Sequence, residues 1–95
     1  FIAGHSLQDI FLDNSFLLPT TEEGYCELKN KQVSIVIQPL INYPYLQVYT
    51  PPHRQSVAIE NLSAAPNAFN NGLGLLRLLP NEPVSFAPSY REDVL

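Results

Sequence analysis

The 95 residues of this chain include nine acidic and five basic side chains, which give a formal net charge of −4 at pH 7. This charge disfavours nucleic acid and anionic membrane surfaces as partners, because both are negatively charged themselves. The sequence has no apolar stretch of transmembrane length and no signal-peptide pattern, so we expect a cytoplasmic protein with no membrane partner.

The predicted elements are strands and loops. Nine prolines are present, and long stripes of apolar residues with a 3.6-residue period are missing. A hairpin turn is predicted at Lys29-Asn30-Lys31, chain breaks at Pro39 and Pro44, and one helical turn near residues 67–71. This pattern predicts an all-β fold of antiparallel meanders packed as a β-sandwich. The expected strands are residues 10–18, 24–29, 33–38, 45–50, 56–62, 75–79 and 84–90.

The sequence gives no indication of a metal site or a disulfide. Cys26 is the only cysteine, so it cannot form an internal disulfide. No cationic side chain lies within two positions of Cys26, and we expect a small strand residue rather than a reactive thiol. His5 and His53 stand far apart in sequence, and we expect neither a metal nor a cofactor.

Glu60 is a carboxylate inside an otherwise apolar strand-like run. Alternation places it on one face with Ala58 and Leu62, while Val57 and Ile59 share the other face. Because both faces carry apolar residues, we expect Glu60 to be buried, which for an unpaired carboxylate costs several kcal/mol. Desolvation would make the carboxylate a stronger base, suited to general-base catalysis. The alternatives are an exposed strand glutamate and a structural ion pair.

Asp13 and Gln47 also interrupt apolar strand patterns. Gln47 shares a strand face with Tyr45 and Tyr49, whose rings and hydroxyls suit a sugar, since sugars present apolar C–H faces and many hydroxyls. Packing of the tyrosines at a strand surface is an equal alternative. Asp13 could equally be a turn or edge residue.

Three stretches, taken in order, resemble the C-terminal part of the aldose 1-epimerase (galactose mutarotase) family. They read FLDNSF at residues 11–16, YLQVYT at residues 45–50 and AIENLSAAPNAFN at residues 58–70. The resemblance implies a galactose mutarotase-like β-sandwich, of which residues 1–95 are the C-terminal segment of a single domain. The chain opens on Phe1 and contains no methionine, so we expect it to be the C-terminal segment of a longer protein whose N-terminal half is missing here.

The resemblance also implies roles for the three polar residues. Glu60 matches the general base that takes the proton of the anomeric hydroxyl, and Asp13 and Gln47 match positions that hydrogen-bond the sugar. Ring opening, rotation about C1–C2 and re-closure would interconvert the α and β anomers of a hexose without cofactor or metal. The alternative is a non-catalytic carbohydrate-binding or structural β-sandwich module.

The chain departs from the family pattern in two ways. The family's general acid, a histidine in an Asn-His-X-Tyr-Phe-Asn type motif, and its upstream sugar-binding arginine are not found, and neither His5 nor His53 matches. We therefore expect this segment to be inactive without the missing N-terminal half. The stretch after Ile59 reads Glu60-Asn61-Leu62 instead of the common Glu-Thr-Gln, which leaves room for a non-galactose or phosphorylated sugar.

Overall fold

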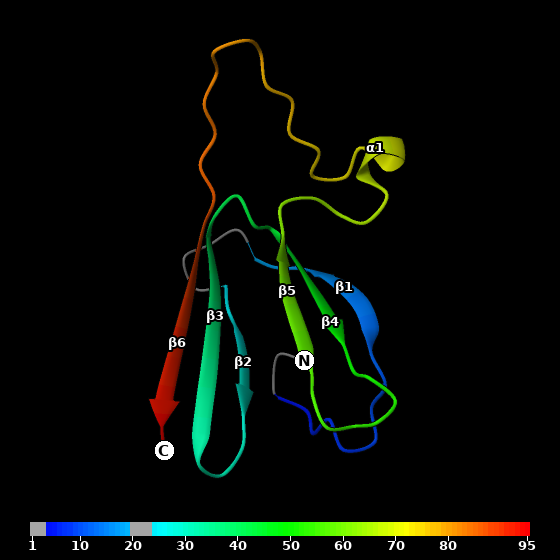
Figure 1. The fold of residues 1–95 in the computed structure, drawn as a ribbon, viewed down its shortest axis with the longest axis vertical. Helices are drawn as coiled ribbons and strands as arrows, with labels where there is room; N and C mark the ends of the chain where they lie inside the picture. The colour runs from blue at the N-terminus through cyan, green and yellow to red at the C-terminus, as the bar shows by residue number, and fades with distance from the viewer. Residues whose placement is uncertain (1–3, 20–23) are drawn as a thin grey trace.

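The computed structural model describes residues 4–19 and 24–95, which form six strands and one short helix (Figure 1). The regular secondary structure of these residues is therefore β, apart from a single helical turn. The elements are β1 (Asp13–Leu17), β2 (Cys26–Lys29), β3 (Val33–Ile41), β4 (Tyr45–Tyr49), β5 (Ala58–Leu62), α1 (Ala68–Asn71) and β6 (Ala87–Val94).

The strands form two antiparallel sheets of three strands each, in the orders β1-β4-β5 and β2-β3-β6. Hairpins join β2 to β3 and β4 to β5, whereas β1 and β6 reach their partners from distant parts of the sequence. Figure 1 shows the two sheets beside each other, with the long connection between α1 and β6 rising beyond one end of both. The chain thus passes from one sheet to the other after β1, after β3 and after β5.

The β2–β3 hairpin forms where the sequence predicted a turn. The side-chain oxygen of Asn30 accepts hydrogen bonds from the backbone N–H groups of Gln32 (2.7 Å) and Val33 (2.9 Å). The Asn30 N–H donates to the carbonyl of Val33 at 3.0 Å, which closes the turn. An asparagine side chain that caps its own turn in this way explains why the chain reverses here.

The predicted break at Pro39 is wrong, because β3 continues through it for nine residues. The pairing with β6 changes register between Gln38 and Ile41, so the proline lies at an irregularity where no ladder N–H is needed. The strand ends instead at Ile41, just before Asn42, which has a φ of 60°. The Asn42 side-chain amide donates to the Ser85 carbonyl at 2.6 Å and so holds this corner to the chain before β6.

Both sheets contribute to one small core. Its buried members are Ile37 from β3 and Leu46 and Val48 from β4. A hydrogen bond of 3.0 Å from the Asn61 amide to the Tyr90 hydroxyl also joins β5 to β6. The partly buried residues packed against this core are Leu12, Phe16, Leu18, Cys26, Val57 and Ile59.

The two C-terminal strand predictions were only partly correct. Residues 75–79 form no strand, although their composition is apolar, and Leu78 and Leu79 are exposed. A strand needs a neighbour for its backbone N–H and C=O groups, and this stretch has none among the described elements. The strand predicted at residues 84–90 exists as β6 but begins and ends later. The helical turn predicted near residues 67–71 is confirmed by α1.

The described chain leaves much apolar surface open. Its radius of gyration is 15.0 Å, compared with about 13 Å for a compact domain of 100 residues. The buried apolar side chains are Val36, Ile37, Leu46 and Val48. Phe69, Val94 and Leu79, in contrast, are 95%, 85% and 73% exposed. The core is therefore small for the apolar content of the sequence.

Candidate functional site

The register of the β1-β4-β5 sheet brings the three predicted site residues to one face. Gln47 lies in the central strand, directly opposite Ser15 of β1 and Glu60 of β5. Asp13 lies two residues before Ser15 and therefore on the same side of the sheet. We call this surface the polar face and define it by Asp13, Ser15, Gln47 and Glu60. It is the opposite side of β4 from Leu46 and Val48, which alternate with Gln47 and point into the core.

Gln47 is held by hydrogen bonds to β1 at both ends of its amide. Its Nε2 donates to Asp13 Oδ1 at 2.8 Å, and its Oε1 accepts a short hydrogen bond from the Ser15 hydroxyl. The amide of glutamine donates through its NH2 group and accepts through its oxygen, and here each end has a partner on β1. These two bonds therefore fix the orientation of the Gln47 amide. Asp13 and Gln47 therefore form one hydrogen-bonded unit across two strands.

Glu60 is exposed, so the predicted burial of its carboxylate is wrong. The face it shares with Ala58 and Leu62 is the outer face of the sheet, where these residues lie opposite Tyr49 and Tyr45. Within residues 4–19 and 24–95, Glu60 forms no salt bridge. The exposed strand glutamate, one of the two alternatives that the sequence left open, is the arrangement observed. Its carboxylate is free to meet a ligand.

Tyrosines flank the polar face on both sides of Gln47. Tyr45 is half-buried and Tyr49 is 39% exposed, and both share the face of Gln47 by alternation along β4. The surface thus combines two carboxylates, an amide, a hydroxyl and two aromatic rings. Such a set can accept hydrogen bonds from hydroxyl groups and pack against an apolar C–H face, which are the two demands of a sugar.

A histidine that could act as the general acid is not part of the polar face. The strands β1, β4 and β5 contain no histidine. His53 lies in the loop between β4 and β5, where its Nδ1 accepts a hydrogen bond of 3.0 Å from the Gln55 N–H. The strands of the polar face therefore supply carboxylates, including the proposed base Glu60, but no histidine to act as the acid.

Cys26 is a structural residue rather than a reactive thiol. Cys26 is half-buried against the core, and this burial raises the pKa of its thiol above the ordinary 9.0. The thiol is accordingly protonated at neutral pH and a poor nucleophile.

No group of histidine, cysteine, aspartate and glutamate side chains in residues 4–19 and 24–95 is arranged to hold a metal ion. The helix of the described part is also too short and polar to cross a membrane.

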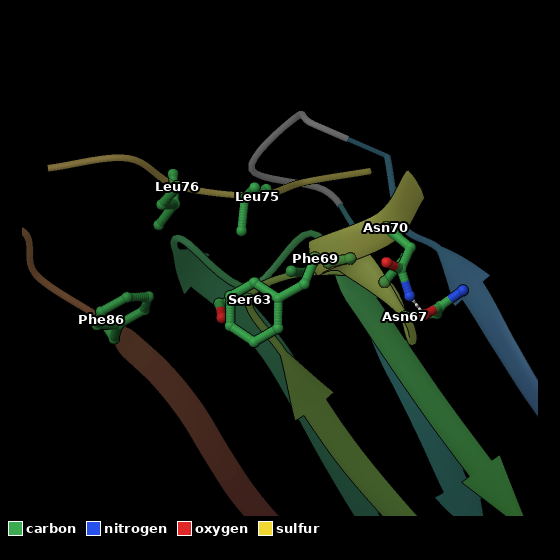
Figure 2. Close-up of a pocket in the computed structure, with 10 residues that line it drawn as sticks. Ser63, Asn67, Phe69, Asn70, Leu75, Leu76 and Phe86 are labelled. Atoms are coloured by element: carbon green, nitrogen blue, oxygen red, sulfur yellow. Dashed lines mark hydrogen bonds between the residues drawn. The ribbon is translucent and has the colours of Figure 1, made fainter. Parts of the chain in front are cut away.

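A hollow that the sequence analysis missed lies just past the end of β5. It has a volume of about 530 Å³ and opens to solvent. Figure 2 shows the Phe69 ring reaching from the α1 turn into the same space as Phe86, with Leu75 and Leu76 along another side. The lining contains no ionisable side chain, so the hollow suits a neutral group. Its lining residues are Ser63, Ala64, Ala65, Asn67, Ala68, Phe69, Asn70, Leu75, Leu76 and Phe86.

The loop that borders the hollow packs tightly against the tyrosine at the edge of the polar face. A Cβ atom built on Gly74 would lie 2.7 Å from Tyr45 Cε2 and 3.1 Å from the Ala64 Cα. Only a residue without a side chain fits at this approach. The hollow is close to the polar face along the chain as well, since Ser63 follows Glu60 by three residues, or about 10 Å of extended strand.

Comparison with known proteins adds no relative. No protein-family model, no curated protein and no solved structure matches this chain. A functional proposal therefore depends on the residues of the polar face and on the resemblance of the three sequence stretches.

Proposed function

We propose that this chain forms the sugar-binding and general-base part of an aldose 1-epimerase-like enzyme. Glu60 is the base, and Asp13 and Gln47 bind the sugar. The observation that supports this is the Asp13–Gln47 hydrogen bond with Glu60 directly opposite Gln47 on one exposed face. Neighbouring strands lie about 5 Å apart, so the row from β1 to β5 spans about 10 Å. One hexose with its hydroxyl groups bridges such a span.

The chemistry follows from the position of the carboxylate. Glu60 takes the proton of the anomeric hydroxyl, the C1–O5 bond breaks, and the ring oxygen receives a proton from a general acid outside this segment. After rotation about C1–C2 the ring oxygen attacks the other face of C1 and gives its proton back to that general acid, while Glu60 returns its proton to the anomeric oxygen. The bound sugar covers the carboxylate and displaces water from it, which supplies the desolvation that the free chain lacks.

We also propose a fold, a substrate class and a compartment for this reaction. The two sheets belong to a galactose mutarotase-like β-sandwich whose N-terminal half carries the acid. The substrate is a hexose or a sugar phosphate, the reaction needs no cofactor, and we expect it to occur in the cytoplasm. The segment alone binds sugar but does not accelerate mutarotation.

Polarimetry of a freshly dissolved α-anomer tests the proposal. In the longer protein that contains this segment, Glu60→Gln keeps the shape of the side chain and removes the base. We expect kcat to fall by about 10²–10⁴-fold, with little change in KM. Glu92→Gln on β6 makes the same change outside the polar face and should have no effect. A Glu60→Gln variant that keeps the wild-type kcat on several aldoses would exclude Glu60 as the base.

A non-catalytic carbohydrate-binding module is the second candidate. It is favoured by the exposure of Glu60 and by the absence of histidine from β1, β4 and β5. This reading predicts hexose binding that Gln47→Ala weakens, together with mutarotation at the buffer rate even in the longer protein. NMR titration with glucose and galactose, run beside polarimetry, separates the two functions.

A further inference from the structure

Arg54 holds the segment that precedes β1. It donates hydrogen bonds through Nη1 to the carbonyl of Ile10 at 2.7 Å and through Nη2 to the carbonyls of Leu7 and Gln8, the latter at 3.1 Å. The centre of its guanidinium group also lies 4.4 Å from the centroid of the Phe11 ring. One side chain from the loop between β4 and β5 therefore contacts four residues that are more than 40 positions earlier in the sequence.

The chemistry of these contacts requires arginine. Three carbonyl oxygens and an aromatic face need a planar cation with several donors, which lysine does not provide. The backbone of Arg54 lies in the left-handed region, with a φ of 62° that is uncommon for a residue with a side chain. Its N–H donates to the Pro51 carbonyl at 3.0 Å, so a tight turn aims the side chain at the segment. Strained backbone of this kind is kept where the surrounding contacts fix it.

The held segment leads directly into the polar face. Leu12 and Thr50 exchange hydrogen bonds next to it, from the Leu12 N–H to Thr50 Oγ1 at 2.7 Å and from the Thr50 N–H to the Leu12 carbonyl at 2.8 Å. Asp13 is the next residue and the first of β1. In the described sheet β1 is an edge strand that pairs only with β4. Its first residue therefore depends on β4 and on the anchor just before it.

We propose that Arg54 is a positioning residue for Asp13. By fixing the carbonyls of Leu7, Gln8 and Ile10, it holds the start of β1 against β4 and keeps the Asp13 carboxylate on Gln47. The inference rests on the proposed function, because it takes Asp13 as a sugar contact. Arg54 itself touches no residue of the polar face. Its effect on sugar binding passes through Asp13.

A double-mutant cycle on the full chain measures this dependence. The variants are Arg54→Ala, Asp13→Ala and the pair, with the dissociation constants of glucose and galactose obtained by NMR titration. Arg54→Ala should weaken binding about tenfold, as for loss of a hydrogen bond to a charged group. The double variant should bind no more weakly than Asp13→Ala alone. Arg77→Ala removes the same charge elsewhere and should change nothing. The proposal would be overturned if the double variant weakened binding by the product of the two single-variant factors, because the two residues would then act independently.

Amide hydrogen exchange tests the same inference without sugar. Arg54→Ala should speed exchange of the Leu12 and Thr50 amides about tenfold or more, while the amide of Ile37 in β3 keeps its rate. Arg54→Lys keeps the charge but loses the fork of donors, so it should also speed exchange of the Leu12 and Thr50 amides, and it replaces Arg54→Ala if alanine unfolds the chain. Unchanged exchange at Leu12 and Thr50 refutes positioning by Arg54. Absence of hexose binding in the parent chain refutes the proposed function instead, and the exchange result still decides the role of Arg54.

Discussion

Replacement of Gly74 by alanine should destabilise the fold far more than the same change at Gly72. Both glycines have a left-handed backbone, with φ of 73° and 74°, and an alanine in that conformation costs about 1–2 kcal/mol. A Cβ at Gly72 meets nothing within 4 Å. A Cβ at Gly74 meets Tyr45 at 2.7 Å and the backbone of Ala64 at 3.1 Å. Overpacking of this kind adds about 1–3 kcal/mol.

The expected free energies of unfolding therefore fall by about 1–2 kcal/mol for Gly72→Ala and about 2–5 kcal/mol for Gly74→Ala. For a chain of this size, each kcal/mol lowers Tm by about 4–8 °C. Urea unfolding followed by circular dichroism, at several protein concentrations, measures both variants under the same conditions. Equal losses for the two variants would show that the loop does not pack against Tyr45. Gly74→Ala should cost less in a Tyr45→Ala background than in the parent chain, because the nearest atom is then gone.

Two further predictions concern association and the thiol. The chain should self-associate as its concentration rises, which sedimentation velocity measures. Large apolar side chains such as Phe69 and Val94 are exposed, and the outer strands β1 and β6 have unpaired edges in the described sheets. A monomer that unfolds in one cooperative transition would contradict this. Cys26 should react with iodoacetamide more slowly than a free cysteine between pH 7 and 9, since burial raises its pKa, and urea should restore the ordinary rate. The sign of this shift also requires that stability falls as pH rises above about 9, an effect that Cys26→Ala should remove.

The sequence was a good guide where local patterns decide the structure. Alternation located β4 and β5 within two residues at each end, and the asparagine-containing turn located the β2–β3 hairpin. Pro39 misled because proline interrupts a strand only where a ladder N–H is needed, and the register change beside β6 removes that need. The apolar residues 75–79 misled because composition does not reveal whether a partner strand exists.

The residues of the candidate site could be predicted from the sequence, but their exposure and their arrangement could not. Asp13, Gln47 and Glu60 could be named from their apolar surroundings, but which face of β5 lies outside depends on how the two sheets pack. The same limit explains the wrong expectation for Glu60, which assumed that both faces were covered. The Ser15 hydroxyl and the Arg54 side chain were missed because their partners lie 32 and 43 or more residues away, and no local pattern reports such contacts.

The order of strands in the β1-β4-β5 sheet sets when the polar face can form during folding. Gln47 and Glu60 belong to one hairpin, whereas the hydrogen bond from Gln47 to Asp13 closes a loop of 34 residues. Closure of the longer loop costs more chain entropy, so we expect the hairpin to form before β1 docks. Under the proposed function, a sugar that contacts both Asp13 and Glu60 binds only the state in which β1 is docked, and its binding free energy then stabilises β1 in that position. Sugar binding and the docking of β1 would then be thermodynamically linked, so that each stabilises the other.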